Sequence, residues 1–192
     1  MLVFAYGSLL WHPGFQPKES IPATAVDRRR SWCVQSTVYR GTAQTPGAVL
    51  GLIEGGRCSG LLYSVESCDC GRVAEYLHSR EMAETGYRPE IIDVETSSGV
   101  ASALTYVSDP SQRLDTPPER ILGIIMRARG ISGSNAEYAG RTLETIQELG
   151  MSLDEDEVGF PSEIVMTIMK ARAITQMIDN HCVNRLPEAE LA

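Results

Sequence analysis

The amino-acid sequence predicts an α+β fold, in which a small mixed β-sheet or barrel with one inserted helix precedes a helical C-terminal third. Two observations carry this prediction. The first two-thirds of the chain contain short apolar runs separated by Gly and Pro, which is typical of strands joined by turns. From residue 117 onward, apolar residues instead recur at the period of a helix. A chain of 192 residues is long enough to bury a sizeable core.

Seven short segments are predicted as strands, and one helix is expected between them, over residues 68–82. Several of the strand segments are apolar on both faces, which favours a closed or covered sheet over an open one. The segments are 2–5, 23–26, 31–37, 48–53 and 60–65 before the helix, and 90–95 and 101–107 after it.

The C-terminal third is expected to hold three helices. The first runs from residue 117 to 129, where two prolines open an apolar stripe and a glycine follows its end. The second begins at Ser134, because Glu137 three residues later completes a capping box. The last is expected over 162–179. The acidic run 154–157 before it is expected to form a solvated loop or to support the N-terminus of that helix.

Charge and composition exclude several classes of partner. The chain has 17 Lys and Arg against 25 Asp and Glu, so its net charge is 17 − 25 = −8, and neither nucleic acid nor an anionic membrane is an expected partner. No apolar stretch approaches the ~18 residues of a membrane span, and no signal peptide is visible, so a cytoplasmic location is expected. We expect a monomer or weak dimer, with residues 1–150 as the main domain. Residues 151–192 are expected to form an acidic loop and a helix that pack on this domain or extend it.

The five cysteines, at positions 33, 58, 68, 70 and 182, form no metal-binding pattern. Their number is odd, no CxxC pair occurs, and the spacing of Cys68 and Cys70 is too tight for a usual zinc knuckle. We therefore expect free thiols, no metal site and no cofactor.

One acidic residue falls on the apolar face of the helix predicted over 68–82. That face is formed by Cys70, Val73, Ala74 and Leu77. At ~100° per residue Glu81 lies within the same arc, so its carboxylate should face the sheet, where burial raises its pKa and makes it a better proton acceptor. The alternative is that Glu81 pairs with Arg80 or Arg88 at a frayed helix end. Glu84 is a nearby competitor, expected in the following loop.

The segment Tyr6-Gly7-Ser8-Leu9 follows the first predicted strand and is expected to form a turn. Gly7 lets the backbone turn where a side chain would block a ligand, and successive N–H groups in such a turn can cradle an anion. Taken alone the signal is weak, since many strands end in a turn with Gly. The segment is neither a P-loop nor a GxSxG elbow.

Six segments, taken in order, carry a resemblance to one family. They are VFAYGSLLW (3–11), RRSWCVQST (29–37) with Arg40-Gly41, Pro46-Gly47, CSGLLY (58–63), YLHSRE (76–81) with Gly86-Tyr87, and GSNAEY (133–138). Over roughly residues 1–150 the chain resembles the ChaC-type γ-glutamylcyclotransferases, which act on glutathione.

The resemblance implies a reaction and a set of site residues. The α-amine of a γ-glutamyl group attacks its own γ-amide carbonyl, which closes 5-oxoproline and releases Cys-Gly when glutathione is the substrate, with no cofactor. The inserted helix then carries the catalytic base, Glu81. The residues expected to bind substrate are Val3, Phe4, Ala5, Tyr6, Gly7, Ser8, Leu9, Arg40 and Tyr138. A salt bridge for Arg40 and helix packing for Tyr138 are the alternative roles.

The chain departs from the family pattern at two places. Tyr39 stands where the family often has His, and Leu114-Asp115-Thr116-Pro117 replaces a tyrosine-containing motif, so a substrate contact from the loop 112–118 is in doubt. These departures keep two other functions open. One is the same chemistry on another γ-glutamyl amine or peptide. The other is a non-catalytic ligand-binding protein on the same fold.

Overall fold

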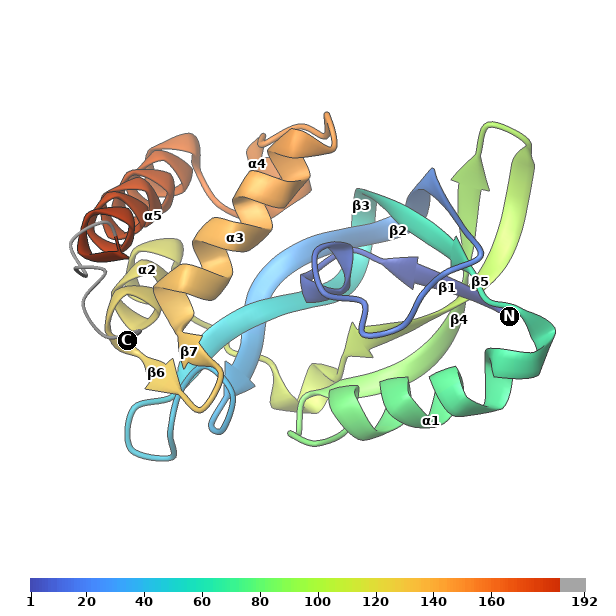
Figure 1. Cartoon of the computed structure of the whole chain (residues 1–192), viewed down its shortest axis with the longest axis horizontal. Coiled ribbons are helices and arrows are strands. Elements are labelled where there is room, and N and C mark those ends of the chain that lie inside the picture. The colour runs from blue at the N-terminus through green and yellow to red at the C-terminus, as the bar shows by residue number, and fades with distance from the viewer. Residues whose placement is uncertain (184–192) are drawn as a thin grey trace, which may run out of the picture.

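Five strands close into a barrel in the computed structural model, which describes the backbone of residues 1–183 and the side chains of residues 1–177 (Figure 1). The strands are β1 (Leu2–Ala5), β2 (Glu19–Ser36), β3 (Gly47–Ser64), β4 (Tyr87–Thr96) and β5 (Gly99–Ser108). Their order around the barrel is β1-β3-β2-β4-β5. All neighbours are antiparallel except β1 and β5, which pair in parallel through Val3 and Leu104. The predicted mixed barrel is confirmed.

The predicted breaks within β2 and β3 are wrong, because each pair of expected short strands is one long strand. The segments 23–26 and 31–37 fall in β2, and 48–53 and 60–65 fall in β3, apart from Thr37 and Val65, which lie one residue past the strand ends. At the expected break the register shifts by a bulge between Val26 and Arg28. Gly55 and Gly56, at φ 85° and 78°, lie on the opposite strand. Glycine permits these angles, so the residues that resemble a turn form a bulge within a continuous ladder.

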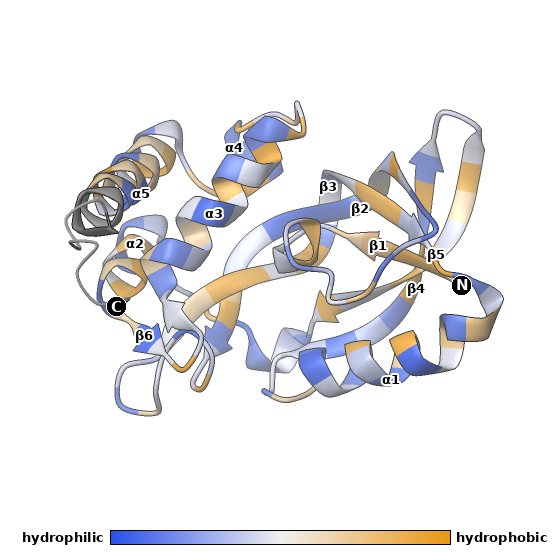
Figure 2. Cartoon of the chain, viewed as in Figure 1, coloured by the Kyte–Doolittle hydropathy of each residue, from blue (hydrophilic) through white to orange (hydrophobic). Residues whose placement is uncertain are grey.

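The barrel interior is the centre of the hydrophobic core. Phe4, Leu50 and Leu52 are buried there, and apolar colour runs along β1 and part of β3 in Figure 2. This packing holds β1 rigidly, so the turn that follows β1 starts from a fixed point.

The four longer helices agree with the periodicity of the sequence. The helices are α1 (Cys70–Glu81), α2 (Pro118–Arg127), α3 (Asn135–Glu148), α4 (Glu155–Val158) and α5 (Ser162–Val183), with three 3₁₀ turns at Ser8–Leu10, Ser67–Asp69 and Pro110–Gln112. Ser134 caps α3, its hydroxyl accepting from the amide of Glu137 at 3.1 Å, as the capping box predicts. A small hairpin, β6 (Arg129–Gly130) and β7 (Gly133–Ser134), joins α2 to α3. The helices α2 to α5 gather at one end of the barrel and α1 lies apart from them (Figure 1).

The acidic run 154–157 is not a solvated loop, which was one of the two structures expected for it. It contains the short helix α4, and Glu157 turns inward to meet Arg30, with Nη1 and Oε2 3.1 Å apart. The Arg30 side chain is fully buried, so it needs an anionic partner. The two residues are far apart in sequence, and no local pattern connects them.

The C-terminal helix α5 packs beside α3, where Arg172 and Glu144 approach to 3.3 Å (Figure 1). Phe160 and Ile168 join the same buried cluster as the barrel strands. The division at residue 150 stays a prediction, and both Cys182 and the end of the expected unit 151–192 lie outside the described side chains. Within the described residues, no helix is long and apolar enough to cross a membrane.

Candidate active site

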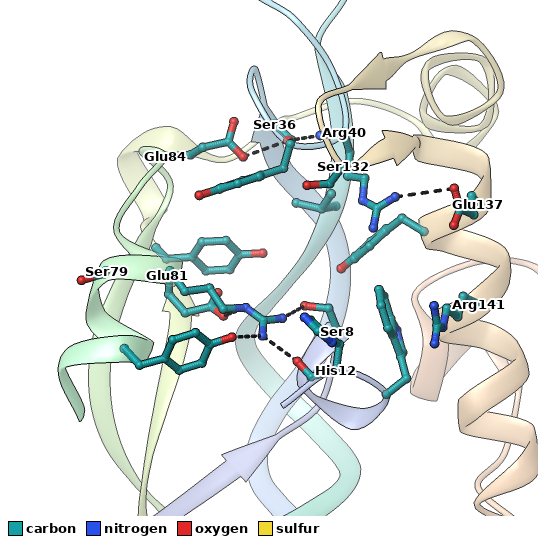
Figure 3. Close-up of a pocket in the computed structure, with 17 residues that line it drawn as sticks. Ser8, His12, Ser36, Arg40, Ser79, Glu81, Glu84, Ser132, Glu137 and Arg141 are labelled. Carbon is teal, nitrogen blue, oxygen red and sulfur yellow. Dashed lines mark hydrogen bonds and ion pairs between the residues drawn. The ribbon is translucent and has the colours of Figure 1, made fainter. Parts of the chain in front are cut away.

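A cleft of about 700 Å³ opens between α1 and α3 at the mouth of the barrel (Figure 3). Its walls carry charged and aromatic side chains from five parts of the chain. The lining residues are Ser8, Trp11, His12, Ser36, Tyr39, Arg40, Val49, Tyr76, Ser79, Arg80, Glu81, Glu84, Tyr87, Ser132, Glu137, Tyr138 and Arg141. Four of the predicted site residues, Ser8, Arg40, Glu81 and Tyr138, therefore meet in one cleft.

Glu81 is the last residue of α1, and its side chain is only 15% exposed. It lines the cleft, as its helical position predicts. Burial raises the pKa of its carboxyl above the ordinary value of 4.5, while the nearby Arg80 guanidinium acts in the opposite direction. The alternative role is observed as well, because Arg80 Nε lies 3.2 Å from Glu81 Oε1; Arg88 instead pairs with Glu90 at 2.8 Å.

Arg80 joins α1 to the N-terminal segment. Its guanidinium donates to the carbonyl of His12 at 2.6 Å, to the Tyr76 hydroxyl at 3.0 Å and to Ser8 Oγ at 2.9 Å. The sequence indicates Arg80 only as an ion-pair partner of Glu81. The structure shows that the same cation also positions the turn that faces the carboxylate.

The turn after β1 presents free amides to this carboxylate. Ser8–Leu10 is a 3₁₀ turn, in which the first amides have no acceptor of their own. Among the hydrogen bonds of the described chain, none is donated by the amides of Gly7, Ser8 or Leu9. A second cavity of about 30 Å³ is lined by Tyr6 through Leu9 together with Glu81. The turn and the carboxylate thus face a common space.

The first three residues of the predicted N-terminal segment lie in the core and not in the cleft. Val3, Phe4 and Ala5 are all 0% exposed and line neither cavity, so they belong to the core beneath the site. Above them, the carbonyl of Tyr6 accepts from Arg30 Nε at 2.8 Å. This bond fixes the start of the turn from inside the barrel.

Four tyrosines line the small cavity, and the side chains of three of them, Tyr6, Tyr87 and Tyr138, are hydrogen-bonded to the backbone around it. The Tyr6 hydroxyl donates to the carbonyl of Tyr106 at 2.7 Å, the Tyr87 hydroxyl donates to the carbonyl of Leu50, and the Tyr138 hydroxyl accepts from the Leu50 amide at 3.4 Å. Burial raises the pKa of all three, that of Tyr138 to about 12. They remain neutral near pH 7 and form a wall of low polarity around Glu81.

One motif residue, Asn135 at the start of α3, serves to place Tyr138. The buried Asn135 accepts from the Ala48 amide at 2.7 Å and donates to the Ala48 carbonyl at 2.9 Å, which docks the start of α3 on β3. Tyr138 lies one turn further along the helix. The position of Tyr138 in the cleft therefore depends on the Asn135 side chain, which makes the same pair of hydrogen bonds with Ala48 as the backbone of a neighbouring strand would.

Glu84 lies in the loop after α1, as expected, and holds the opposite loop after β2. Its carboxylate accepts from the Val38 amide at 2.7 Å and from Ser36 Oγ at 2.9 Å, and Ser36 Oγ accepts from the Arg40 amide at 2.9 Å. Glu84 is thus committed to backbone and hydroxyl donors. This distinguishes Glu84 from Glu81, whose carboxylate makes an ion pair with Arg80 but accepts no hydrogen bond from a backbone amide or hydroxyl of the described residues.

Arg40 lines the cleft and also makes the ion pair that was considered as its alternative role. Its guanidinium lines the cleft, donates to the Ser134 carbonyl at 3.3 Å, lies 4.0 Å from Glu137 and stands 5.5 Å from the centre of the Tyr138 ring. Burial lowers the pKa of Arg40, with Glu137 opposing this effect.

The two departures from the family pattern have different consequences. Tyr39 lines the cleft, whereas no residue of 112–118 does so. In that loop, the Leu114 amide donates to the Cys33 carbonyl at 2.7 Å, which ties the loop to β2. Among the described residues, no group of three or more His, Cys, Asp or Glu side chains could hold a metal ion.

The barrel and its helices have the γ-glutamyl cyclotransferase fold, as two solved structures show. A crystal structure of a γ-glutamyl cyclotransferase specific to glutathione from yeast matches with a TM-score of 0.76 and 21% identity, covering 90% of this chain and 96% of that one. A further solved γ-glutamyl cyclotransferase matches with a TM-score of 0.53 and 15% identity, covering 88% and 98%.

The chain belongs to the ChaC-like protein family, whose model matches residues 1–168 and so extends past the 150 residues expected to carry the resemblance. A glutathione-specific γ-glutamylcyclotransferase of Escherichia coli is 33% identical over 79% of this chain and 68% of its own length. The γ-glutamylcyclotransferase 2-3 of Arabidopsis thaliana is 33% identical over 78% of this chain and 81% of its own length.

Proposed function

We propose that this protein is a γ-glutamylcyclotransferase that cleaves glutathione into 5-oxoproline and Cys-Gly. The observation that carries the proposal is the shared cavity of Glu81 and the turn Tyr6–Leu9, which sets a proton acceptor opposite a row of free amides. The membership in the ChaC-like family and the names of the two relatives support the choice of reaction and substrate.

The reaction is an internal aminolysis. The nitrogen of the substrate's α-amine forms a bond to its own γ-carbonyl carbon, and the bond from that carbon to the leaving nitrogen breaks. Because nucleophile and electrophile belong to one molecule, the protein has to fold the γ-glutamyl chain rather than bring two reactants together. No water is consumed in this step.

Glu81 is proposed to move the proton that this reaction requires. An α-ammonium group has a pKa of about 8, and an ordinary Glu is roughly 3.5 pH units more acidic, a mismatch of about 5 kcal/mol. Burial raises the pKa of Glu81 and so narrows this gap. The carboxylate takes the proton from the amine and returns it to the leaving nitrogen, and Arg80 beside it keeps the ionised form accessible.

The turn Tyr6–Leu9 is proposed to hold the negative charges of the substrate. The free amides of Gly7, Ser8 and Leu9 can donate to the α-carboxylate and to the oxyanion that develops on the γ-carbonyl oxygen. The neutral tyrosines around the cavity lower the local polarity, which strengthens these hydrogen bonds.

A pair of variants on the same helix tests the role of Glu81. With glutathione and a chelator present, the wild-type protein should release 5-oxoproline. Glu81→Gln should lose about 10²- to 10⁴-fold in kcat, the usual contribution of a general base, with unchanged thermal unfolding. Glu75→Gln, on the exposed side of α1, is the control and should keep full activity. Full activity in Glu81→Gln would refute the assigned role.

A second substrate class is favoured by one observation, the presence of Tyr39 in the cleft wall. The same chemistry on another γ-glutamyl amine or peptide would leave Glu81 and the turn with the same tasks. Competition between glutathione and a panel of γ-glutamyl compounds decides between the two. Ligand binding without any release of 5-oxoproline would instead indicate a non-catalytic binding protein.

We also propose that the protein works in the cytoplasm as a monomer or weak dimer. The support for the location is that Cys33, Cys58, Cys68 and Cys70 are free thiols, the state that a reducing compartment maintains. Localisation of the tagged protein in cells tests the first statement, and sedimentation over a range of concentrations tests the second.

A further inference from the structure

One cation in the cleft has no acidic partner among the described residues. Of the three arginines that line the cleft, Arg80 faces Glu81 at 3.2 Å and Arg40 faces Glu137 at 4.0 Å. The guanidinium of Arg141 takes part in none of the ion pairs or hydrogen bonds of the described side chains, and the residue is exposed. The third acid of the cleft, Glu84, is occupied by the amides and hydroxyl of the loop after β2.

Arg141 is nevertheless held in place. Its guanidinium carbon lies 4.4 Å from the centre of the Trp11 ring, a cation–π contact. Trp11 in turn donates from Nε1 to Thr142 Oγ1 at 3.2 Å, and the fully buried Thr142 donates to the Tyr138 carbonyl at 2.8 Å. Stacking on an indole leaves the N–H edge of a guanidinium free, and that edge matches the two oxygens of a carboxylate.

The position of Arg141 relative to Glu81 indicates which part of a bound substrate can reach Arg141. The two residues stand on opposite walls of the cleft, with Ser8 and His12 between them (Figure 3). A γ-glutamyl group that places its α-amine at Glu81 and its α-carboxylate at the turn must send the remainder of the molecule toward α3. An attached dipeptide extends about 7 Å, at ~3.3–3.6 Å per residue, and ends in a carboxylate.

We propose that Arg141, stacked on Trp11, binds the C-terminal carboxylate of the peptide joined to the γ-glutamyl group and thereby selects γ-glutamyl peptides over γ-glutamyl amines. This inference rests on the proposed function and deepens it by naming the feature of the substrate that is recognised. A protein with a net charge of −8 repels anions at long range, so a local cation is needed for this end of the substrate.

The test compares glutathione with its glycine ethyl ester, which keeps the α-amine, the α-carboxylate and the thiol but lacks the terminal charge. In the wild-type protein kcat/KM should be about tenfold higher for glutathione, the discrimination expected of one charge-assisted contact. In Arg141→Gln the KM for glutathione should rise about tenfold at unchanged kcat, while the ester is unaffected, so the preference disappears. The matched control is Arg127→Gln, because Arg127 is an exposed residue of α2 outside the cleft. This variant should keep the preference for glutathione over the ester.

Two results overturn the subsite. If Arg141→Gln lowers kcat/KM equally for glutathione and for the ester, the arginine acts on a group that the two substrates share, such as the α-carboxylate. If kcat/KM is unchanged for both substrates, Arg141 binds neither of them. Calorimetry of both ligands with Glu81→Gln, alone and combined with Arg141→Gln, measures the same preference as dissociation constants without turnover. A wild-type protein that forms no 5-oxoproline from either compound refutes the proposed function, while the calorimetric comparison still decides the subsite.

Discussion

Replacing Glu157 with Gln removes the charge that neutralises a buried arginine. The Arg30 guanidinium is 0% exposed and donates to the Tyr6 carbonyl at 2.8 Å, to the Glu157 carbonyl at 3.0 Å and to the Glu157 carboxylate at 3.1 Å. The same carboxylate accepts from Ser59 Oγ at 2.8 Å. Gln has nearly the same shape and keeps one oxygen acceptor, so Glu157→Gln tests the charge rather than the packing.

The magnitude follows from the burial of the two partners. Removing one member of a buried ion pair costs about 3–5 kcal/mol. The Glu157 side chain is 19% exposed, so water compensates part of the loss, and we expect about 2–3 kcal/mol. For a chain of this length each 1 kcal/mol lowers Tm by about 2–4 °C, which gives a decrease of roughly 4–12 °C.

Thermal unfolding followed by circular dichroism at pH 7 measures this decrease. Glu155→Gln is the matched control, because Glu155 belongs to the same short helix but is exposed and makes no ion pair within the described chain. Its Tm should fall by less than about 4 °C, since a helix-dipole contribution at the surface is below about 1 kcal/mol. A Tm for Glu157→Gln equal to that of the control would refute the reasoning, because the Arg30 charge would then be stabilised without its partner.

Two further predictions concern the cleft. Burial raises the pKa of Glu81, and the base must be ionised to act, so kcat/KM for glutathione should fall as the pH drops through that raised pKa. The charge of Arg80 lowers the pKa of Glu81. Arg80→Met removes this charge and should therefore move the acid limb of the pH profile to higher pH. An acid limb in the same place would contradict the assignment. Glu84→Ala should raise KM about tenfold with little change in kcat, since about 1.5 kcal/mol of hydrogen bonding to the loop that carries Arg40 is lost. The exposed Glu119→Ala is its control, and equal KM values in the two variants would show that Glu84 does not hold this loop.

Much of the candidate site follows from local patterns in the sequence. The period of α1 places Glu81 on the same face as Leu77, and the structure has this carboxylate in the cleft. The turn Tyr6–Leu9 follows from a short apolar strand that runs into a glycine. Helix caps such as Ser134 depend only on residues three positions apart, so they too can be predicted from the sequence.

Other features depend on which distant residues the barrel brings together. Val3, Phe4 and Ala5 share a motif with the turn but become core, because β1 is enclosed by its neighbouring strands. Arg141 and Trp11 belong to segments that carry no common pattern, and only the packing of α3 against the turn after β1 stacks them.

Local patterns in the sequence were therefore enough to predict the α+β class, the positions of α1, α2, α3 and α5, and the place of Glu81 on the apolar face of α1, since these rest on periodicity and capping within a few residues. Only the tertiary structure decided that β2 and β3 are continuous, that Glu157 neutralises Arg30 and that Arg141 is left without an acid. The physical reason is that register, burial and charge pairing arise from contacts between segments far apart in the chain. Their partners are chosen when the barrel closes and not by any local preference.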